Sequence, residues 1–179
     1  MKKVMVRIEG VSPLLMHRFP VSEGETTKSR NLKKNQDDVE SYLYLDENKK
    51  LVQPSTHVIA ALKVAGAKYQ IPGQGKATYK KVVGSGAVMI DPDMIPHEFQ
   101  EWEIDRRPVV VQRARIVRSR PRLNRWALSF SAEYDDEEIS KSTLKELFDY
   151  SGKRSGLGDF RPSVGGPFGR FIVTRFDEG

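Results

Sequence analysis

The sequence predicts an α+β fold in which two helices pack on one face of an antiparallel sheet. Segments near both ends and in the second half alternate apolar and polar residues, which is the period of a half-buried strand. Two other segments repeat their apolar residues at helical spacing. The chain has 179 residues and no cysteine, so it is long enough to bury one core, and disulfide scaffolds, thiolate metal sites and cysteine nucleophiles are excluded.

The N-terminal half begins with a strand and continues to a helix. Residues 3–9 alternate strictly and predict a strand with one buried face. Residues 20–40 are polar and almost without core formers, so they are predicted to be a mobile insertion. Apolar residues at 42–45 and 51–52 flank a polar turn and predict a short hairpin. A helix is predicted to start at residues 54–56 and to end near Ile71.

The second half supplies the remaining strands and the second helix. Strands are predicted at 87–90, 109–117, 126–134 and 171–176, and a helix at 139–148 that Gly152 ends. The coarse order is strand, helix, strand, strand, helix, strand, with hairpin and loop insertions. This βαββαβ order is that of the ferredoxin-like, or RRM-like, fold, and residues 1–179 are predicted to form one domain. The uncovered face of such a sheet commonly binds single-stranded nucleic acid.

The positive charge is concentrated in one segment, which we call the Arg-rich ribbon, residues 106–125. The ribbon contains eight arginines and no acid, so it carries +8 and the rest of the chain sums to −2, given a net charge of +6. Several arginines are two residues apart, which places alternate side chains on one face of an extended strand. The pattern favours a phosphate-binding surface, and the alternative is a solvated edge strand that uses charge against aggregation. The candidates are Arg113, Arg115, Arg118, Arg120, Arg122 and Arg125.

A second candidate is the Gly-rich loop, residues 152–170, which holds six of the 14 glycines, four cations and one acid. Glycine amides can approach an anion closely while cations supply charge. The alternative is an irregular connection that glycine makes tight. The spacing fits neither a dinucleotide fingerprint nor a P-loop, so an NTPase is disfavoured. The candidate binding residues are Lys153, Arg154, Gly156, Gly158, Arg161, Gly165, Gly166 and Arg170.

The Gly-rich loop, a helix before it and a terminal strand after it resemble the C-terminal loop of the repeat-associated mysterious protein (RAMP) superfamily of CRISPR systems. The opening strand with Gly10, Leu14 and Leu15, and the helix start Gln53-Pro54-Ser55-Thr56, also resemble that superfamily. The ribbon and the loop around Asp159 are also similar to small phage and mobile-element proteins. The resemblance implies a ferredoxin-like RNA-binding core whose backbone subunits hold the phosphates of a guide RNA and insert a hairpin between bases. The resemblance implies that residues 20–40 and 113–125 are segments of this kind, inserted into the core fold.

The three histidines, His17, His57 and His97, are about forty residues apart, and no metal site is predicted from them. Some RAMP endoribonucleases cut RNA without metal by using a His as general acid or base near a Tyr or Lys. The resemblance therefore implies that His57 or His17, with Lys63 or Tyr69, is a candidate catalytic residue. The alternative is a surface histidine, or one that binds a phosphate.

The sequence favours a non-enzymatic, sequence-tolerant binder of single-stranded nucleic acid, RNA ahead of DNA, that is a backbone-binding subunit of a CRISPR-type effector or related ribonucleoprotein. No cofactor is predicted, and the partners are single-stranded RNA or DNA and further copies or subunits. No apolar run reaches membrane-spanning length, so a soluble cytoplasmic protein is expected. Two alternatives remain: a metal-independent endoribonuclease, and an oligomeric interaction protein whose ribbon meets the acidic residues 133–138 of a neighbouring copy.

Overall fold

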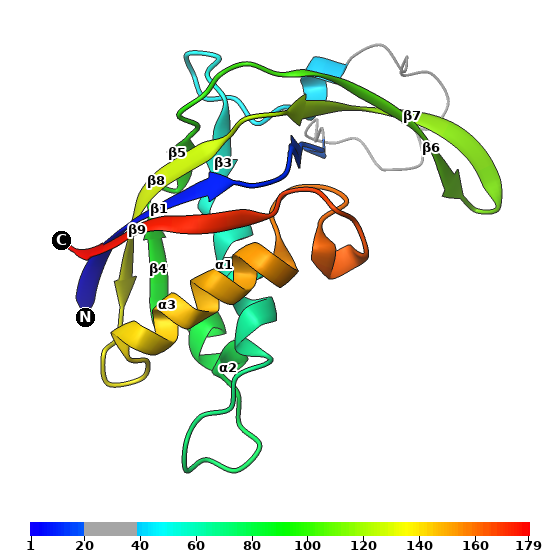
Figure 1. Ribbon diagram of the computed structural model, residues 1–179. Coiled ribbons are helices and arrows are strands. Elements are labelled where there is room, and N and C mark those ends of the chain that lie inside the picture. The colour runs from blue at the N-terminus through cyan, green and yellow to red at the C-terminus, as the bar shows by residue number, and fades with distance from the viewer. Residues whose placement is uncertain (20–38) are drawn as a thin grey trace, which may run out of the picture.

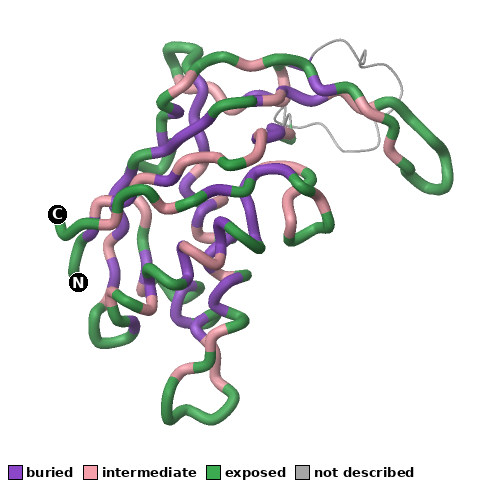
Figure 2. The backbone as a smooth tube through the Cα atoms, viewed as in Figure 1, coloured by how far each residue is buried: buried purple, intermediate pink, exposed green. Residues whose placement is uncertain are grey.

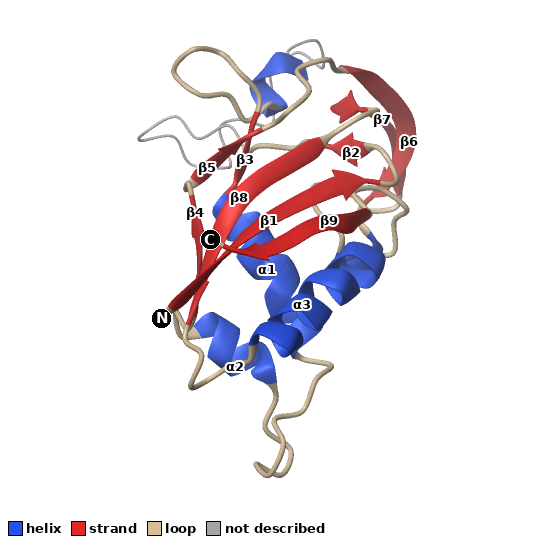
Figure 3. Ribbon diagram, turned by 60° about the vertical axis from the view of Figure 1, so that its left-hand side comes forward, coloured by secondary structure: helices blue, strands red, loops and turns tan. Residues whose placement is uncertain are grey.

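The computed structural model describes residues 1–19 and 39–179, and its centre is a four-stranded antiparallel sheet (Figure 1). The strand order is β4 (Val88–Asp91), β8 (Ala127–Tyr134), β1 (Lys2–Gly10) and β9 (Phe171–Glu178). Helices α1 (Ser55–Gly66) and α3 (Lys141–Tyr150) lie on one face of this sheet (Figure 3). This is the predicted ferredoxin-like α+β arrangement. The insertion predicted at 20–40 lies outside the described residues, except that Val39 and Glu40 begin a short 3-10 helix, η1 (Val39–Tyr42).

The core lies between the sheet and the helices. In the middle of β1 every second residue is buried: Val4, Val6 and Ile8, which pair with equally buried residues of β8. Leu62 of α1 and Phe148 of α3 close this layer and are fully buried. Buried residues therefore follow the strands and the inner helix faces, while loops and the outer parts of the chain are exposed (Figure 2). The alternation at residues 3–9 is explained by one buried sheet face.

Helix α1 ends at Gly66, so the prediction that it continues to about Ile71 is wrong. Helix α2 (Tyr79–Gly84) packs against α1 at this point, and a Cβ on Gly66 would lie 2.8 Å from the backbone nitrogen of Lys80. The close approach of a second backbone therefore requires glycine at the last residue of α1. Helix α3 starts at Lys141, two residues after the predicted start at residue 139, because Ser140 caps it: the Ser140 side chain accepts a hydrogen bond of 3.1 Å from the Thr143 backbone N–H.

The single strand predicted at 109–117 is also wrong, because the chain reverses in its middle. Strands β6 (Glu103–Val111) and β7 (Ala114–Leu123) form a long antiparallel hairpin, with Gln112 and Arg113 at the turn. Both turn residues have positive φ, 48° and 68°, as a tight two-residue hairpin turn requires. The hairpin extends the Arg-rich ribbon into a two-stranded arm that projects from the body (Figure 1).

Smaller strands attach the arm and the first helix to the body. Strand β2 (Leu14–Leu15) pairs with the base of β7. Strand β3 (Val52–Pro54), which leads into α1, pairs with β5 (Met94–Pro96). The hairpin predicted at 42–45 and 51–52 is reduced to one bridge between Leu45 and Leu51. After α3 the chain forms a π-helical turn, η2 (Ser151–Ser155), and a 3-10 turn, η3 (Pro162–Val164), before β9.

Candidate nucleic-acid interface

The arginines of the hairpin lie on both of its faces. Arg118, Arg120 and Arg122 alternate along β7 and share one face, as their spacing predicts, and they oppose Arg107, Asp105 and Glu103 of β6. Arg115 lies on the opposite face, and Arg113 is in the turn. The arm therefore presents positive charge in more than one direction.

At the base of the hairpin, arginines are neutralised by carboxylates. Arg120 is only 4% exposed, and its Nη1 lies 2.9 Å from Asp159 Oδ2 in the Gly-rich loop. Arg107 donates two hydrogen bonds of 2.7 Å to Asp105, and Arg122 lies 3.4 Å from the same carboxylate. The hydrogen bond from Arg107 is the main reason that the pKa of Asp105 is below its ordinary value. Arg120 and Arg122 therefore hold the arm together, which the ribbon's lack of acids had not predicted.

In the part of the chain that the structure describes, the arginines toward the tip of the hairpin form no ion pair. Arg113 and Arg115 are exposed and Arg118 is half-buried, and none of these three pairs with a carboxylate within residues 1–19 and 39–179. Arg106, nearer the base, is also exposed and without an ion pair in the same residues. Arg125, just beyond the hairpin, stacks on Phe99 with its Cζ 4.0 Å from the ring centroid. The charge available to a ligand is therefore concentrated toward the tip of the arm.

The Gly-rich loop is fixed by hydrogen bonds to three other parts of the fold. The hydroxyls of Ser151 and Ser155 both donate to the Ala61 carbonyl of α1, at 3.1 Å. The Asp159 N–H donates to Leu15, and the Gly169 N–H to Pro13, both at 2.8 Å. A segment without long regular structure is thus held in one position against β2 and α1.

Most loop glycines serve this packing. The N–H groups of Gly165 and Gly166 already donate to carbonyls of the loop itself at 3.0 Å, and that of Gly156 donates to the Ser151 carbonyl just before the loop at 2.8 Å. The interpretation that these amides bind an anion is therefore not supported. At Gly158 a Cβ would lie 2.4 Å from the Leu15 carbonyl oxygen, so glycine is required by close approach.

The cations of the loop have a different environment. Lys153, Arg154 and Arg170 line a hollow of about 540 Å³ together with Pro162 and Gly166. All three cations are exposed, and none has a carboxylate partner in the part of the chain that the structure describes. Binding of an anion by these side chains stays a prediction.

The hairpin and the Gly-rich loop form one unit. Asp159 joins them, because it accepts from Arg120 and also lies 3.3 Å from His17 Nδ1. The hydrogen bond from His17, followed by the charge of Arg120, lowers the pKa of Asp159 to about 2. Phe168 of the loop lies beneath Arg107, with the Cζ of that arginine 4.6 Å from the ring centroid. The two predicted features thus meet at the base of the arm.

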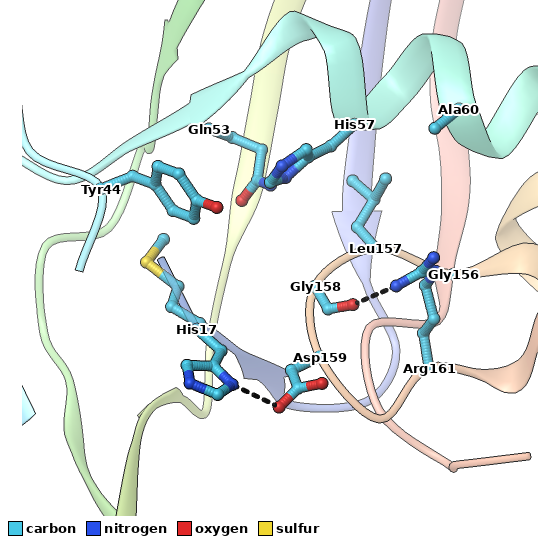
Figure 4. Close-up of a pocket in the computed structure, with 11 residues that line it drawn as sticks. His17, Tyr44, Gln53, His57, Ala60, Gly156, Leu157, Gly158, Asp159 and Arg161 are labelled. Atoms are coloured by element: carbon cyan, nitrogen blue, oxygen red, sulfur yellow. Dashed lines mark hydrogen bonds and ion pairs between the residues drawn. The ribbon is translucent and has the colours of Figure 1, made fainter. Parts of the chain in front are cut away.

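Beside this junction is a pocket of about 250 Å³ (Figure 4). It brings together His17 and His57, forty residues apart in sequence, with Tyr44, Gln53 and Arg161. The histidine candidates therefore share one site with the Gly-rich loop.

The partners predicted for these histidines, Lys63 and Tyr69, are not in the pocket. Lys63 lies beside Gly84 of α2, and Tyr69 packs on Tyr150 with ring centroids 5.9 Å apart. Tyr44 takes their place, with its ring 5.2 Å from that of His57. Tyr69 is outside the pocket because α1 ends before it, at Gly66. Lys63 is outside because it lies on another face of α1 than His57 and Ala60, which line the pocket.

A buried histidine that was not a candidate lies behind the pocket. His97 is 3% exposed, and its Nε2 lies 3.3 Å from Gln53 Oε1. Gln53 Nε2 in turn lies 2.6 Å from His57 Nδ1. Burial lowers the pKa of His97 to about 4, and burial together with the charge of Arg161 lowers the pKa of His57. Both rings are therefore neutral at neutral pH.

The uncovered sheet face differs from the ligand-binding face of an RRM-like sheet. Arg7 pairs with Glu9 and Glu98, each at 2.8 Å, and Lys3 lies 3.7 Å from Glu133. The outward positions of the four strands, all within the described chain, carry no aromatic residue. This face has neither stacking platforms nor a surplus of positive charge, so its side chains do not favour nucleic acid.

In residues 1–19 and 39–179, no three histidine or acidic side chains cluster as metal ligands would. None of the helices in that same part of the chain has the length and apolar character needed to cross a membrane.

No protein-family model matches the sequence, and no curated protein is similar to it at a significant level. The fold is similar to that of a chain in the cryo-EM structure of the type III-B Cmr-β complex bound to cognate target RNA. The TM-score is 0.53 with 14% identity, and the match covers 98% of this chain and 60% of that chain. At this identity the likeness concerns the fold alone.

Proposed function

We propose that the protein binds single-stranded nucleic acid through its phosphates, with RNA ahead of DNA, as a subunit of a CRISPR-type effector or related ribonucleoprotein. The observation that carries this proposal is the distribution of charge along the hairpin, whose base is joined to the Gly-rich loop. Residues 103–123 contain seven arginines and two acids, and both acids lie at the base of the hairpin. Among the described residues, the guanidinium groups toward the tip thus form no ion pair, and such groups suit phosphate oxygens.

The exposed apolar residues of the arm support a role within an assembly. Val110 is 69% exposed and Val117 is 55% exposed, and both lie on the same face as Arg115. When exposed apolar side chains form a contiguous patch, the patch marks an interaction site. The fold neighbour is a chain of a multi-subunit complex bound to RNA. Bases or a neighbouring subunit would cover this face here.

Binding should depend steeply on salt and weakly on base order. With four to seven phosphates contacted, log affinity for a single strand is expected to fall with log salt with a slope of about 3 to 5, at about 0.7 per contact. Fluorescence anisotropy with a labelled 12-nucleotide RNA, a scrambled RNA of the same composition and the matching DNA measures this. Equal affinity for both RNAs, with weaker binding to DNA, agrees with the proposal. A slope near zero contradicts it.

A metal-independent endoribonuclease is the second candidate, and the shared pocket of His17, His57 and Tyr44 favours it. A general acid or base contributes about 10²- to 10⁴-fold to such a reaction. We expect that His57→Ala would abolish cleavage of RNA in EDTA without loss of binding, and that Lys63→Ala, on the same helix but outside the pocket, would have no effect. A wild-type protein that does not cleave RNA under these conditions removes this candidate.

The interaction-protein alternative receives less support from the acidic residues 133–138. Glu133 is paired with Lys3, and Asp136 with Lys2 at 2.9 Å. The Asp135 carbonyl accepts the N–H groups of Glu138 and Ile139 just before α3, as in a turn that starts a helix. Much of the negative charge is therefore used locally. Light scattering before and after nuclease treatment separates the two models, since a filament of protein alone would survive the nuclease.

A further inference from the structure

The pocket beside the hairpin base offers hydrogen-bond donors, while the carboxylate of Asp159 and the carbonyl of Gly158 in its lining already accept hydrogen bonds. Asp159 Oδ2 faces Arg120 and His17, and Oδ1 accepts the Phe160 N–H at 3.0 Å. The Gly158 carbonyl accepts from Arg161 at 3.0 Å. Arg161 keeps further N–H groups, and no carboxylate within the described chain pairs with it.

The hydrogen-bonding role of His57 follows from the buried histidine behind it. If Gln53 donates to His57 and accepts from His97, the unpartnered Nδ1 of His97 is a lone pair. The reverse arrangement would leave that buried nitrogen as an N–H without an acceptor, which is the rarer and more unfavourable state. His57 Nδ1 is therefore an acceptor, and the proton of the neutral ring is on Nε2.

Nε2 of His57 has no hydrogen-bond partner in the described part of the chain, yet it is not among the buried unpaired atoms. It remains accessible and acts as a donor. His57 and Arg161 therefore offer two donors to whatever enters the pocket, and the Tyr44 hydroxyl lies in the same lining.

The shape and lining of the pocket indicate what that ligand is. A volume of about 250 Å³ is several times the roughly 30 Å³ share of one water molecule. Met16, Ala60 and Leu157 supply apolar surface, and the rings of Tyr44 and His17 add aromatic surface. A phosphate ion would leave this apolar part uncovered, whereas a planar heterocycle with polar edges fits both parts.

We propose that this pocket holds one unstacked nucleobase that presents carbonyl oxygens, uracil or guanine, to His57 and Arg161. The inference rests on the proposed strand binding, because Asp159 lines the pocket and also anchors Arg120 of the arm. A strand held along the arm therefore passes the pocket and can place one base in it. Phosphate contacts would give affinity independent of sequence, and this pocket would read one position.

The test compares a 12-nucleotide oligo(C) RNA with the same RNA carrying one central uridine. Uracil differs from cytosine by a carbonyl in place of an amino group at C4, so the donors of the pocket should favour it. We expect about tenfold tighter binding of the uridine RNA, the effect of one to two hydrogen bonds. His57→Phe keeps a ring of similar shape without the donor, and it should bring the ratio of the two affinities to about one.

Arg115→Ala is the matched control, since it should weaken both RNAs equally and keep the ratio. A wild-type ratio of one alongside salt-dependent binding overturns the pocket proposal and leaves the proposed function intact. A preference that persists in His57→Phe also overturns it. If neither RNA binds, the proposed function fails, and titration with mononucleotides then tests the pocket proposal by itself.

Nuclear magnetic resonance provides that independent measurement. A long-range ¹H–¹⁵N spectrum should show Nδ1 of His57 unprotonated and Nε2 protonated, and the opposite tautomer overturns the proposal. The His57 ring signals should shift with UMP and not with CMP or inorganic phosphate. An equal response to phosphate would identify a simple anion site, and no response to UMP would exclude a base pocket.

Discussion

Replacement of Arg113, Arg115 and Arg118 together by alanine is expected to weaken binding to every single-stranded oligonucleotide by about a hundredfold at 0.1 M salt. Each lost phosphate contact removes about 0.7 from the salt slope, so the slope should fall by about 2. These three arginines lie at the turn and on the two faces of the hairpin, and none has an acidic partner in the described residues. Their loss should therefore change charge without loosening the fold.

The base of the arm depends on two other arginines, which this variant retains. Arg120 is buried against Asp159, and Arg122 is bound to Asp105, so substituting either would disturb the base of the arm. A variant that combines Arg118, Arg120 and Arg122 would mix lost phosphate contacts with lost stability. A thermal melt should show the Arg113, Arg115 and Arg118 variant to be as stable as the wild type.

The matched control removes the same charge at the other end of the molecule. Lys68, Lys80 and Lys81 are exposed near α2, opposite the projecting hairpin (Figure 1). Their joint replacement by alanine should weaken binding only a fewfold, through the long-range field, and should leave the salt slope nearly unchanged. Equal losses in both variants would mean that net charge, and not the arm, is responsible for binding.

The helices and strands that could be predicted from the sequence are those with a regular spacing of apolar residues. Alternation at residues 3–9 and the helical spacing of apolar residues at 139–148 correspond to β1 and α3, each of which buries one face. The hairpin turn was missed because Gln112 and Arg113 adopt positive φ without the glycine or asparagine that usually marks such turns. The position of the turn determines the strand register, so the pairing of Asp105 with Arg120 could not be predicted without it.

The candidate site depends on long-range contacts that no local pattern carries. His17 and His57 were candidates as separate residues, but their meeting requires β2 and α1 to be placed by the sheet. His97 had no local signal, because its partner Gln53 reaches it across the pairing of β3 with β5. The glycine content of the loop marks a segment with unusual backbone geometry, but it does not indicate which amides donate to the chain itself, as those of Gly156, Gly165, Gly166 and Gly169 do.

Gly169→Ala should have the largest effect on stability, because the Gly-rich loop closes at this residue. Gly169 has φ 70°, and a Cβ there would lie 1.8 Å from the Leu157 carbonyl oxygen. That oxygen belongs to backbone, so no side-chain rotation relieves the collision. The Leu157 N–H also donates to Gly169 at 2.9 Å, and the Gly169 N–H to Pro13, so a shift would break both bonds.

Gly165→Ala is the control that measures the effect of backbone strain without the steric collision expected in Gly169→Ala. Gly165 also has positive φ, 85°, but a Cβ there would meet nothing within 4 Å. It should lower the free energy of unfolding by about 1–2 kcal/mol, the strain of a left-handed residue. Gly169→Ala adds steric overlap and two lost hydrogen bonds, so about 3–5 kcal/mol is expected, measured by urea unfolding. Equal losses would show that the loop yields at Gly169, and the rigid placement of Asp159 and Arg161 beside the pocket would then lose its physical basis.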